Sequence, residues 1–167
     1  DFYILHDVGA IQENDSQQGL AHFLEHMAFQ GTKNFPGKGI ITSLEKHGVS
    51  FGRNINAYTA QNETVYNLSD VPTNSESLLD TCLLILHDWS YYLTLEDDEI
   101  DAERGVITEE WRTRRTPQFR IQKQMFPVLF KDSKYAIRDV IGNLDVIKNF
   151  KYQTIRDFYH EWYRTDL

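Results

Sequence analysis

Two histidines and a glutamate that could bind and use a metal ion lie close together near the start of the chain. They are His22, Glu25 and His26, arranged as HFLEH. On a helix, His22 and His26 are one turn apart on the same face, so their ring nitrogens can reach one ion. Glu25 points near that ion and could take a proton from a water molecule bound to it. The pattern predicts a hydrolytic metal centre, and its alternative interpretation is an amphipathic helix with polar residues facing water.

A third ligand must come from elsewhere, because a catalytic zinc takes three protein ligands and a water molecule. The helix predicted after Thr94 offers Glu103 and Glu110, which are seven residues, or two turns, apart. Both lie along a stripe of apolar positions that we expect to face inward: Ile100, Val106, Ile107 and Trp111. Carboxylates that face a core are costly unless a metal ion or hydrogen bonds compensate them. The alternative is a pair of exposed acids on an acidic helix, and Gly105 between them suggests a close approach by another helix.

The elements that position these residues follow from hydrophobic spacing and turn signals. Thr94 is expected to be the N-cap of the helix that carries the two glutamates, with Glu96, Asp97 and Asp98 in its first turn. Strands are predicted over Phe2–Val8, Val49–Thr59 and Thr64–Leu68. Helices are predicted over Gly19–Gln30, Lys38–His47, Ser75–Leu93, Thr94–Arg115, Gln118–Phe130 and Thr154–Tyr163. This order predicts an α+β fold in which an antiparallel sheet packs against several helices.

Composition narrows the function classes. The 167 residues are a typical length for one domain, and 41% hydrophobic and 13% aromatic residues favour a packed core over disorder. The net charge of −8 disfavours binding to nucleic acid or to anionic membranes. Cys82 is the one cysteine, which excludes an internal disulfide and a cysteine-built zinc finger, and its apolar surroundings predict core packing. No run of 18 apolar residues could span a membrane.

Three segments of the sequence can be compared with known families: HFLEHMAFQGT at His22–Thr32, NAYT at Asn56–Thr59 and ERGVITEE at Glu103–Glu110. Together they resemble the pitrilysin/insulysin family of zinc metallopeptidases, a group of inverzincins akin to the mitochondrial processing peptidase. The resemblance covers nearly the whole chain and looks closest to the bacterial, periplasmic-type branch. It implies that Glu110 completes the zinc site and that Glu103 supports it from outside. The usual family spacing, counted from His26, falls on Glu103 instead, and extra residues between Gly48 and Asn56 would account for the difference.

The resemblance also implies how the rest of the molecule is organised. The fold would be that of the pitrilysin and mitochondrial-processing-peptidase-like metallohydrolases, truncated at both ends. Residues 1–167 would form a single partial domain, the zinc-binding N-terminal peptidase domain of a longer multi-domain chain. One Zn²⁺ per site is expected, with Glu25 as general base, and the remaining half of the same chain would close over the site. This fragment alone is then expected to be weakly active or inactive.

The expected substrates are peptides or unfolded protein segments. Similar enzymes bind them as an added strand along an exposed sheet edge, here at Asn56, Ala57 and Tyr58. Asn56 could also donate a hydrogen bond to the scissile carbonyl oxygen. The branch resemblance suggests the bacterial periplasm or cell envelope as the location. Two alternatives stay open: a non-catalytic scaffold subunit of the same fold, and a metal-dependent lyase that would need Cys82 near the metal.

Overall fold

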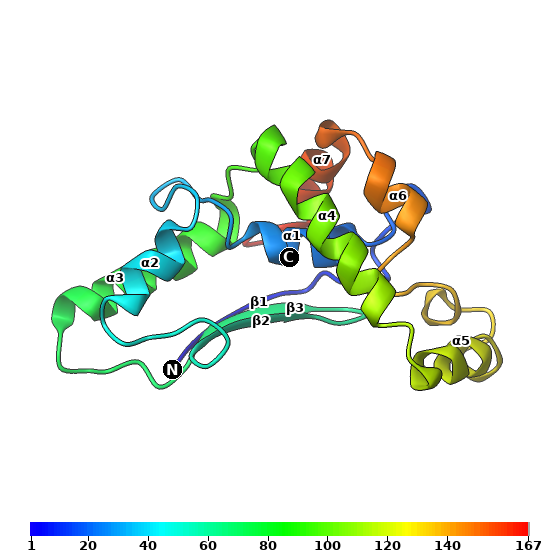
Figure 1. Cartoon of the computed structure of the whole chain (residues 1–167), viewed down its shortest axis with the longest axis horizontal. Helices are drawn as coiled ribbons and strands as arrows, with labels where there is room; N and C mark the ends of the chain where they lie inside the picture. The colour runs from blue at the N-terminus through cyan, green and yellow to red at the C-terminus, as the bar shows by residue number, and fades with distance from the viewer. Residues whose placement is uncertain (167) are drawn as a thin grey trace.

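A three-stranded antiparallel sheet forms the base of the molecule in the computed structural model, which describes residues 1–166 (Figure 1). The strands are β1 (Phe2–His6), β2 (Ile55–Thr59) and β3 (Thr64–Leu68). Their order is β1-β3-β2, so β3 is central and β2 is an edge strand. In this register Tyr66 lies opposite both Ile4 and Ala57. The short turn after Thr59 joins β2 and β3 into a hairpin.

Helices cover one face of this sheet, which confirms the predicted α+β fold (Figure 1). α4 crosses above α1, and α5 projects beyond the turn of the β2–β3 hairpin. The helices are α1 (Leu20–Met27), α2 (Gly39–Glu45), α3 (Glu76–Tyr91), α4 (Asp97–Thr113), α5 (Pro117–Leu129), α6 (Leu144–Asn149) and α7 (Tyr152–Trp162), with a short 3₁₀ helix, η1 (Lys134–Ala136). None of the described helices is both long and apolar enough to cross a membrane.

The core lies between the sheet and the helices because side chains alternate along each strand. Tyr66 and Ile55 are fully buried on the helix side, whereas Tyr3 and Tyr58 are about half exposed on the other side. Tyr66 stacks on Trp89 of α3, and the Trp89 indole donates a hydrogen bond to the Ala28 carbonyl oxygen at 3.0 Å. These contacts fix the end of α1 against the sheet.

A buried carboxylate holds the beginning of α1. Glu13 is fully buried, and its two oxygens accept hydrogen bonds from the backbone N–H groups of Gly19 and Ala21, each at 2.9 Å. These two donors belong to the unpaired N–H groups that every helix start carries. Gly19 itself adopts φ 101°, and the backbone of Gly142 packs so closely on it that a Cβ at position 142 would lie 2.3 Å from the Gly19 Cα. The Arg138 guanidinium also donates to the Glu13 carbonyl oxygen, at 3.2 Å.

Two predicted boundaries are wrong. The strand expected over Val49–Thr59 is confined to β2, because residues 49–54 form a turn with Gly52 at φ 79°. The Asn54 side chain closes this turn by accepting from the Ser50 N–H and donating to the Ser69 carbonyl oxygen. α4 begins at Asp97 with Glu96 as N-cap, not at Thr94. The Thr94 N–H is occupied by the Gly31 carbonyl oxygen at 3.2 Å, and Leu95 turns the chain at φ 50°.

Other differences concern the inner face of α4 and two short elements. Ile100 and Ile107 are buried as predicted, but Val106 is 53% exposed. Within the described part of the chain nothing lies within 4 Å of where a Cβ of residue 105 would be, so the expected close approach of another helix to Gly105 is not seen. α6 and η1 were not predicted, because six and three residues are too short to show a hydrophobic period. The remaining predicted helices and strands are present, with ends that differ by a few residues.

Candidate metal centre

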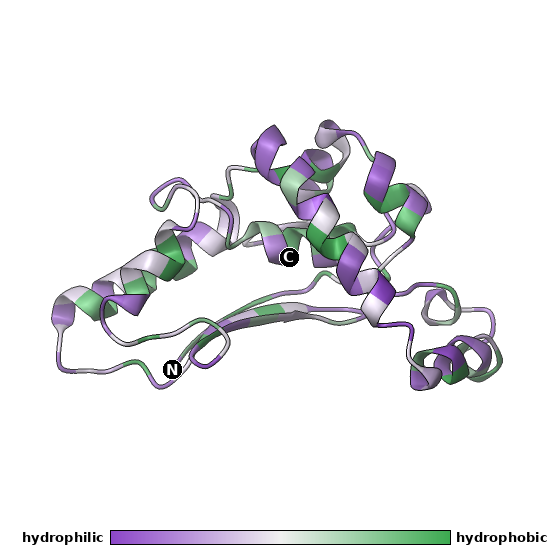
Figure 2. Cartoon of the chain, in the orientation of Figure 1, coloured by the Kyte–Doolittle hydropathy of each residue, from purple (hydrophilic) through white to green (hydrophobic). Residues whose placement is uncertain are grey.

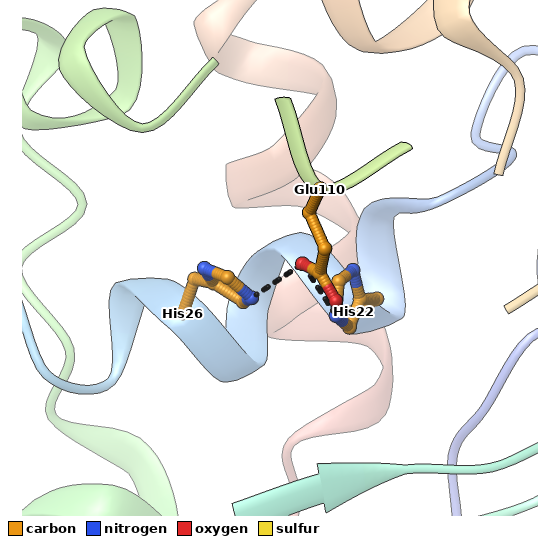
Figure 3. A group of neighbouring side chains, drawn as sticks. All are labelled: His22, His26 and Glu110. Atoms are coloured by element: carbon orange, nitrogen blue, oxygen red, sulfur yellow. Dashed lines mark ion pairs between the residues drawn. The ribbon is translucent and has the colours of Figure 1, made fainter. Parts of the chain in front are cut away.

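His22, His26 and Glu110 meet where α4 crosses α1 (Figure 3). Each offers one ligand atom, and these atoms all lie within 4.8 Å of one another. The Glu110 Oε2 atom is 3.5 Å from His22 Nε2 and 3.4 Å from His26 Nε2. The two imidazole rings stand one helical turn apart with centroids 4.7 Å apart. Thus residues more than 80 positions apart in the sequence converge on one point.

These separations fit a zinc ion. For zinc bonds of about 2.0–2.2 Å in a tetrahedral arrangement, two ligand atoms stand about 3.4 Å apart. Glu110 Oε2 is also buried and lacks a hydrogen-bond partner, which is a costly situation for a carboxylate oxygen unless a cation or a donor compensates it. Two histidines and one glutamate are a donor set of catalytic zinc sites. The chemistry and the spacing of the donors therefore agree.

Glu103 contacts His26 at the ring nitrogen that faces away from Glu110. Its Oε1 accepts a hydrogen bond from His26 Nδ1 at 2.7 Å, and its Oε2 accepts one from Gln30 Nε2 at 2.7 Å. Glu103 is only 4% exposed, so both carboxylate oxygens are occupied inside the protein. A carboxylate on Nδ1 fixes the ring and leaves Nε2 directed at Glu110. The two glutamates of α4 thus contact opposite nitrogens of the same imidazole.

The electrostatics differ sharply between the two histidines. Burial, with a further contribution from the neighbouring His26, lowers the pKa of His22 to about 4. Burial also acts to lower the pKa of His26, but the carboxylates of Glu103 and Glu110 outweigh it and raise that pKa to about 9. For Glu110, burial is outweighed by the facing His26, His22 and Arg114, which lower its pKa to about 2. Glu110 is consequently an anion throughout the physiological range.

Glu25 lies on α1 beside the two histidines and is held by the edge strand. Its Oε2 accepts a hydrogen bond from the Thr59 hydroxyl at 2.7 Å. Burial raises the pKa of the Glu25 carboxyl group, against the smaller effect of that hydrogen bond. A carboxylate with a raised pKa accepts and returns a proton more readily near neutral pH.

A cavity of about 440 Å³ opens next to Glu25 and His26. Its apolar walls come from the residues just after α1, from α2, from the turn before β2, from β2 itself and from α4: Phe29, Ile41, Phe51, Ala57 and Val106. The exposure of Val106 is thereby explained, because this side chain faces the cavity instead of a second helix. Lys38 supplies the lysine side chain of the lining.

The three residues predicted to bind substrate lie on β2, whose outer edge has no strand partner among residues 1–166. Ala57 and Asn56 line the cavity. The Asn56 amide faces backbone carbonyl groups of the 52–55 turn. Tyr58 points to the other face of the sheet, where its hydroxyl donates to Glu63 Oε1 at 2.8 Å. On this edge the backbone of Ile55 already bonds to Ser50 and Gly52 of the preceding turn, so the part of β2 open to a ligand begins after Ile55. The Tyr58 ring faces away from the cavity.

Sequence reasoning did not single out three residues that contact this group. Thr59 holds Glu25, Gln30 holds Glu103, and Arg114 forms an ion pair with Glu110 Oε1 at 2.6 Å. The spacing of four residues between Glu110 and Arg114 on one helix is a readable signal. Thr59 and Gln30 give no such signal, because their partners are distant in the sequence. Cys82 is buried in α3 and is not among the grouped donors, as its predicted core role requires.

The chain belongs to the insulinase family of peptidases, family M16, whose sequence model matches residues 3–132. It is 41% identical over 160 residues to the probable zinc protease PqqL of Haemophilus influenzae, covering 96% of this chain and 17% of that protein. The structure of the first half of the periplasmic protease PqqL from Escherichia coli superposes with a TM-score of 0.92 at 40% identity, covering 97% of this chain and 34% of that one.

Pitrilysin has the same fold, with a TM-score of 0.79 at 24% identity over 99% of this chain and 17% of that structure. The chain thus spans about a sixth of the length of the PqqL proteins it matches. The similarity to these zinc proteases therefore concerns only the matching sixth of their length.

Proposed function

We propose that this chain is the zinc-binding part of a metalloendopeptidase that hydrolyses peptides or unfolded protein segments. The observation that carries the proposal is the convergence of His22, His26 and Glu110 beside Glu25. In this proposal His22, His26 and Glu110 hold one Zn²⁺. Glu103 supports His26 by accepting a hydrogen bond from the Nδ1 atom of that histidine. Membership of the peptidase family and the similarity to named zinc proteases support this assignment.

Bound zinc would acidify a water molecule and polarise the substrate carbonyl group. Glu25 would accept the proton of the attacking water and pass it to the nitrogen of the leaving amine. Burial raises the pKa of Glu25, which favours this two-way transfer, and the Thr59 hydroxyl fixes its orientation at 2.7 Å. Glu103 keeps the His26 ring from rotating, since both of its oxygens are already bonded.

The peptide would be bound as an extra strand on the free edge of β2, at Asn56, Ala57 and Tyr58. Main-chain hydrogen bonds of this kind give affinity for any extended peptide, and pockets then give specificity. The apolar cavity beside Glu25 would take a large apolar side chain next to the scissile bond. The Asn56 amide is engaged by its own turn, so its interaction with the scissile carbonyl would require the side chain to rotate.

The intact protein would be longer, and its remaining half would close over the site. The size of the PqqL proteins, of which this chain spans about a sixth, and the description of one matching structure as a first half support this part of the proposal. Residues 1–167 would then be part of the N-terminal peptidase domain. The same relative is described as periplasmic, which supports a periplasmic or envelope location for this protein.

The test is Glu25→Gln in the intact protein. We expect this variant to bind one zinc ion as the parent does and to lose peptide hydrolysis by about 10²- to 10⁴-fold, the usual contribution of a general base. Glu109→Gln is the matched control, because Glu109 is exposed on α4 and pairs only with Arg112. Zinc content and peptide cleavage are measured side by side. Undiminished hydrolysis by Glu25→Gln would refute the mechanism, and a parent protein that binds no zinc would favour the scaffold alternative.

A further inference from the structure

The segment that follows the metal centre concentrates positive charge in an acidic chain. From Trp111 through Lys131 there are six lysine and arginine residues and no aspartate or glutamate, although the whole chain has a net charge of −8. This segment starts one residue after Glu110 and contains the end of α4 and all of α5. α5 has no buried residue and projects from the body of the molecule (Figure 1). Figure 2 shows that hydrophobic and hydrophilic residues both lie on it.

Two adjoining hollows along this segment form what we call the α5 groove. The first has a volume of about 340 Å³ and lies between α5 and the turn of the β2–β3 hairpin, with Gln61, Arg114, Phe119, Lys123 and the Lys123 partner Asp139 among its lining residues. The second has a volume of about 530 Å³ and is lined by Arg115, Phe119, Arg120, Lys123 and Gln124. The hollows share Phe119 and Lys123, so the groove is continuous from Arg114 outward. Among residues 1–166, no acidic side chain lines the second hollow.

Two of the four cationic side chains named above, Arg115 and Arg120, are available to a ligand. The other two are already paired: Arg114 with Glu110 at 2.6 Å and Lys123 with Asp139 at 3.2 Å. Arg115 and Arg120, by contrast, form no ion pair within residues 1–166, and both are exposed. The Arg115 guanidinium lies 3.6 Å from the centre of the Trp111 ring.

Arg115 and Arg120 are also held in place. Stacking on Trp111 orients Arg115, and Arg120 donates a hydrogen bond to the Arg115 carbonyl oxygen at 3.3 Å. On the side toward α6, Asp139 and Asp145 share a further hollow with Arg115. The positive side of the groove is therefore the side of Arg120, away from α6.

The groove lies where a peptide on β2 would continue. β2 runs toward the hairpin turn, and Gln61 of that turn lines the groove. Both strand pairs in the sheet are antiparallel, so an added antiparallel strand would run opposite to β2. Its N-terminal residues would then reach the groove, while its C-terminal residues would pass the apolar cavity at the other end of β2.

We propose that the α5 groove binds acidic side chains of a polypeptide substrate, on the N-terminal side of the bond that is cut, through Arg115 and Arg120. The inference rests on the proposed peptidase function and adds the substrate class to it. Two exposed guanidinium groups in an open groove match separate carboxylates on an extended peptide. The net charge of −8 opposes a densely charged polyanion such as nucleic acid.

Binding is tested first without catalysis, using the intact protein with Glu25→Gln. The probes are a fluorescent peptide with two glutamates on the N-terminal side of a fixed phenylalanine and its twin with two glutamines. Two exposed ion pairs predict that the glutamate peptide binds about threefold to twentyfold more tightly at low salt. This advantage should disappear after adding Arg115→Gln and Arg120→Gln. It should persist after adding Arg112→Gln instead, because Arg112 pairs with Glu109 and lines neither hollow.

Three binding results would overturn the proposal. The first is equal affinity for the two peptides. The second is an equal loss in the Arg112→Gln control. The third is binding of a short single-stranded DNA as tight as that of the glutamate peptide, which would make the groove a general polyanion site.

Cleavage by the parent protein then separates this inference from the proposed function. We expect kcat/KM to be higher for the glutamate peptide by a similar factor, and we expect no gain when the glutamates are moved to the C-terminal side of the cut. Equal cleavage of both peptides would refute the groove and leave the peptidase standing. If neither peptide is cut while the Glu25→Gln protein still selects the glutamate peptide, the groove stands and the proposed peptidase function fails.

Discussion

Replacing each glutamate of α4 in turn should show which one holds zinc. In Glu110→Gln the anionic oxygen that lies 3.4 Å and 3.5 Å from the two Nε2 atoms becomes part of a neutral amide. Structural zinc sites with four ligands bind with about 10–16 kcal/mol, so one ligand contributes roughly 3–4 kcal/mol. We therefore expect Glu110→Gln to weaken zinc binding by about 10²- to 10³-fold.

Glu103→Gln should cost less, because Glu103 contacts His26 at Nδ1 and not at the nitrogen that faces Glu110. Loss of such a supporting carboxylate typically reduces metal affinity by about 10- to 100-fold. The matched control is again Glu109→Gln, since the Glu109 side chain is 65% exposed and its partner is Arg112. This variant should bind zinc as the parent protein does.

The assay is competition with a chromophoric zinc chelator, with circular dichroism to establish that each variant is folded. The expected order of affinity is parent and Glu109→Gln first, then Glu103→Gln, then Glu110→Gln. A larger loss in Glu103→Gln than in Glu110→Gln would make Glu103 the ligand and refute the reasoning from the geometry of α4. Equal affinity of all four proteins would remove both glutamates from the site.

Three further predictions concern the surroundings of the site. The neighbouring carboxylates raise the pKa of His26 to about 9, so zinc must displace a proton from this histidine. Zinc affinity should therefore fall roughly tenfold per pH unit below pH 9. Chelator competition at pH 6.5, 7.5 and 8.5 measures this, and a constant affinity would contradict it. Glu13→Ala leaves two buried backbone N–H groups unpaired and should lower the free energy of unfolding in urea by about 2–4 kcal/mol, with a smaller loss in Glu13→Gln. An unchanged urea midpoint in Glu13→Ala would be incompatible with capping of α1 by this side chain. Cys82 is buried and its pKa is raised by burial, so a thiol reagent should label it far more slowly in the native than in the denatured protein. Rapid labelling of the native protein with loss of activity would instead support the lyase alternative.

Helical periodicity was the most informative part of the sequence. The four-residue spacing of His22 and His26 and the seven-residue spacing of Glu103 and Glu110 each place two side chains on one helix face, and the structure brings these faces together. Helix geometry is set locally, so such pairs can be predicted without knowledge of the rest of the fold. The count of residues between α1 and α4 carries less information, because the intervening loops can change length without moving either helix.

Features that depend on distant partners were not predictable in the same way. Glu13 lies in a polar segment that suggests a turn, yet its side chain folds back to cap α1. Val106 has the right spacing for the core but lines the open cavity beside His26. Thr94 is a good N-cap residue by type, but it pairs with Gly31 and the next residue, Leu95, adopts φ 50°, so the helix starts only at Asp97. In each case the position of a remote segment decides the outcome, and local pattern does not report it.

The close packing of Gly142 on Gly19 has a practical consequence for the boundaries of any shortened version of the protein. The family match ends at residue 132, but Gly142 and Arg138 both brace the start of α1. Arg104 of α4 likewise donates to the Phe150 carbonyl oxygen, at 2.8 Å. A shortened protein that ends at residue 132 would keep every proposed zinc ligand but lose the residues that pack against α1 and α4 from behind. The smallest excisable unit for metal-binding work therefore extends at least through Phe150.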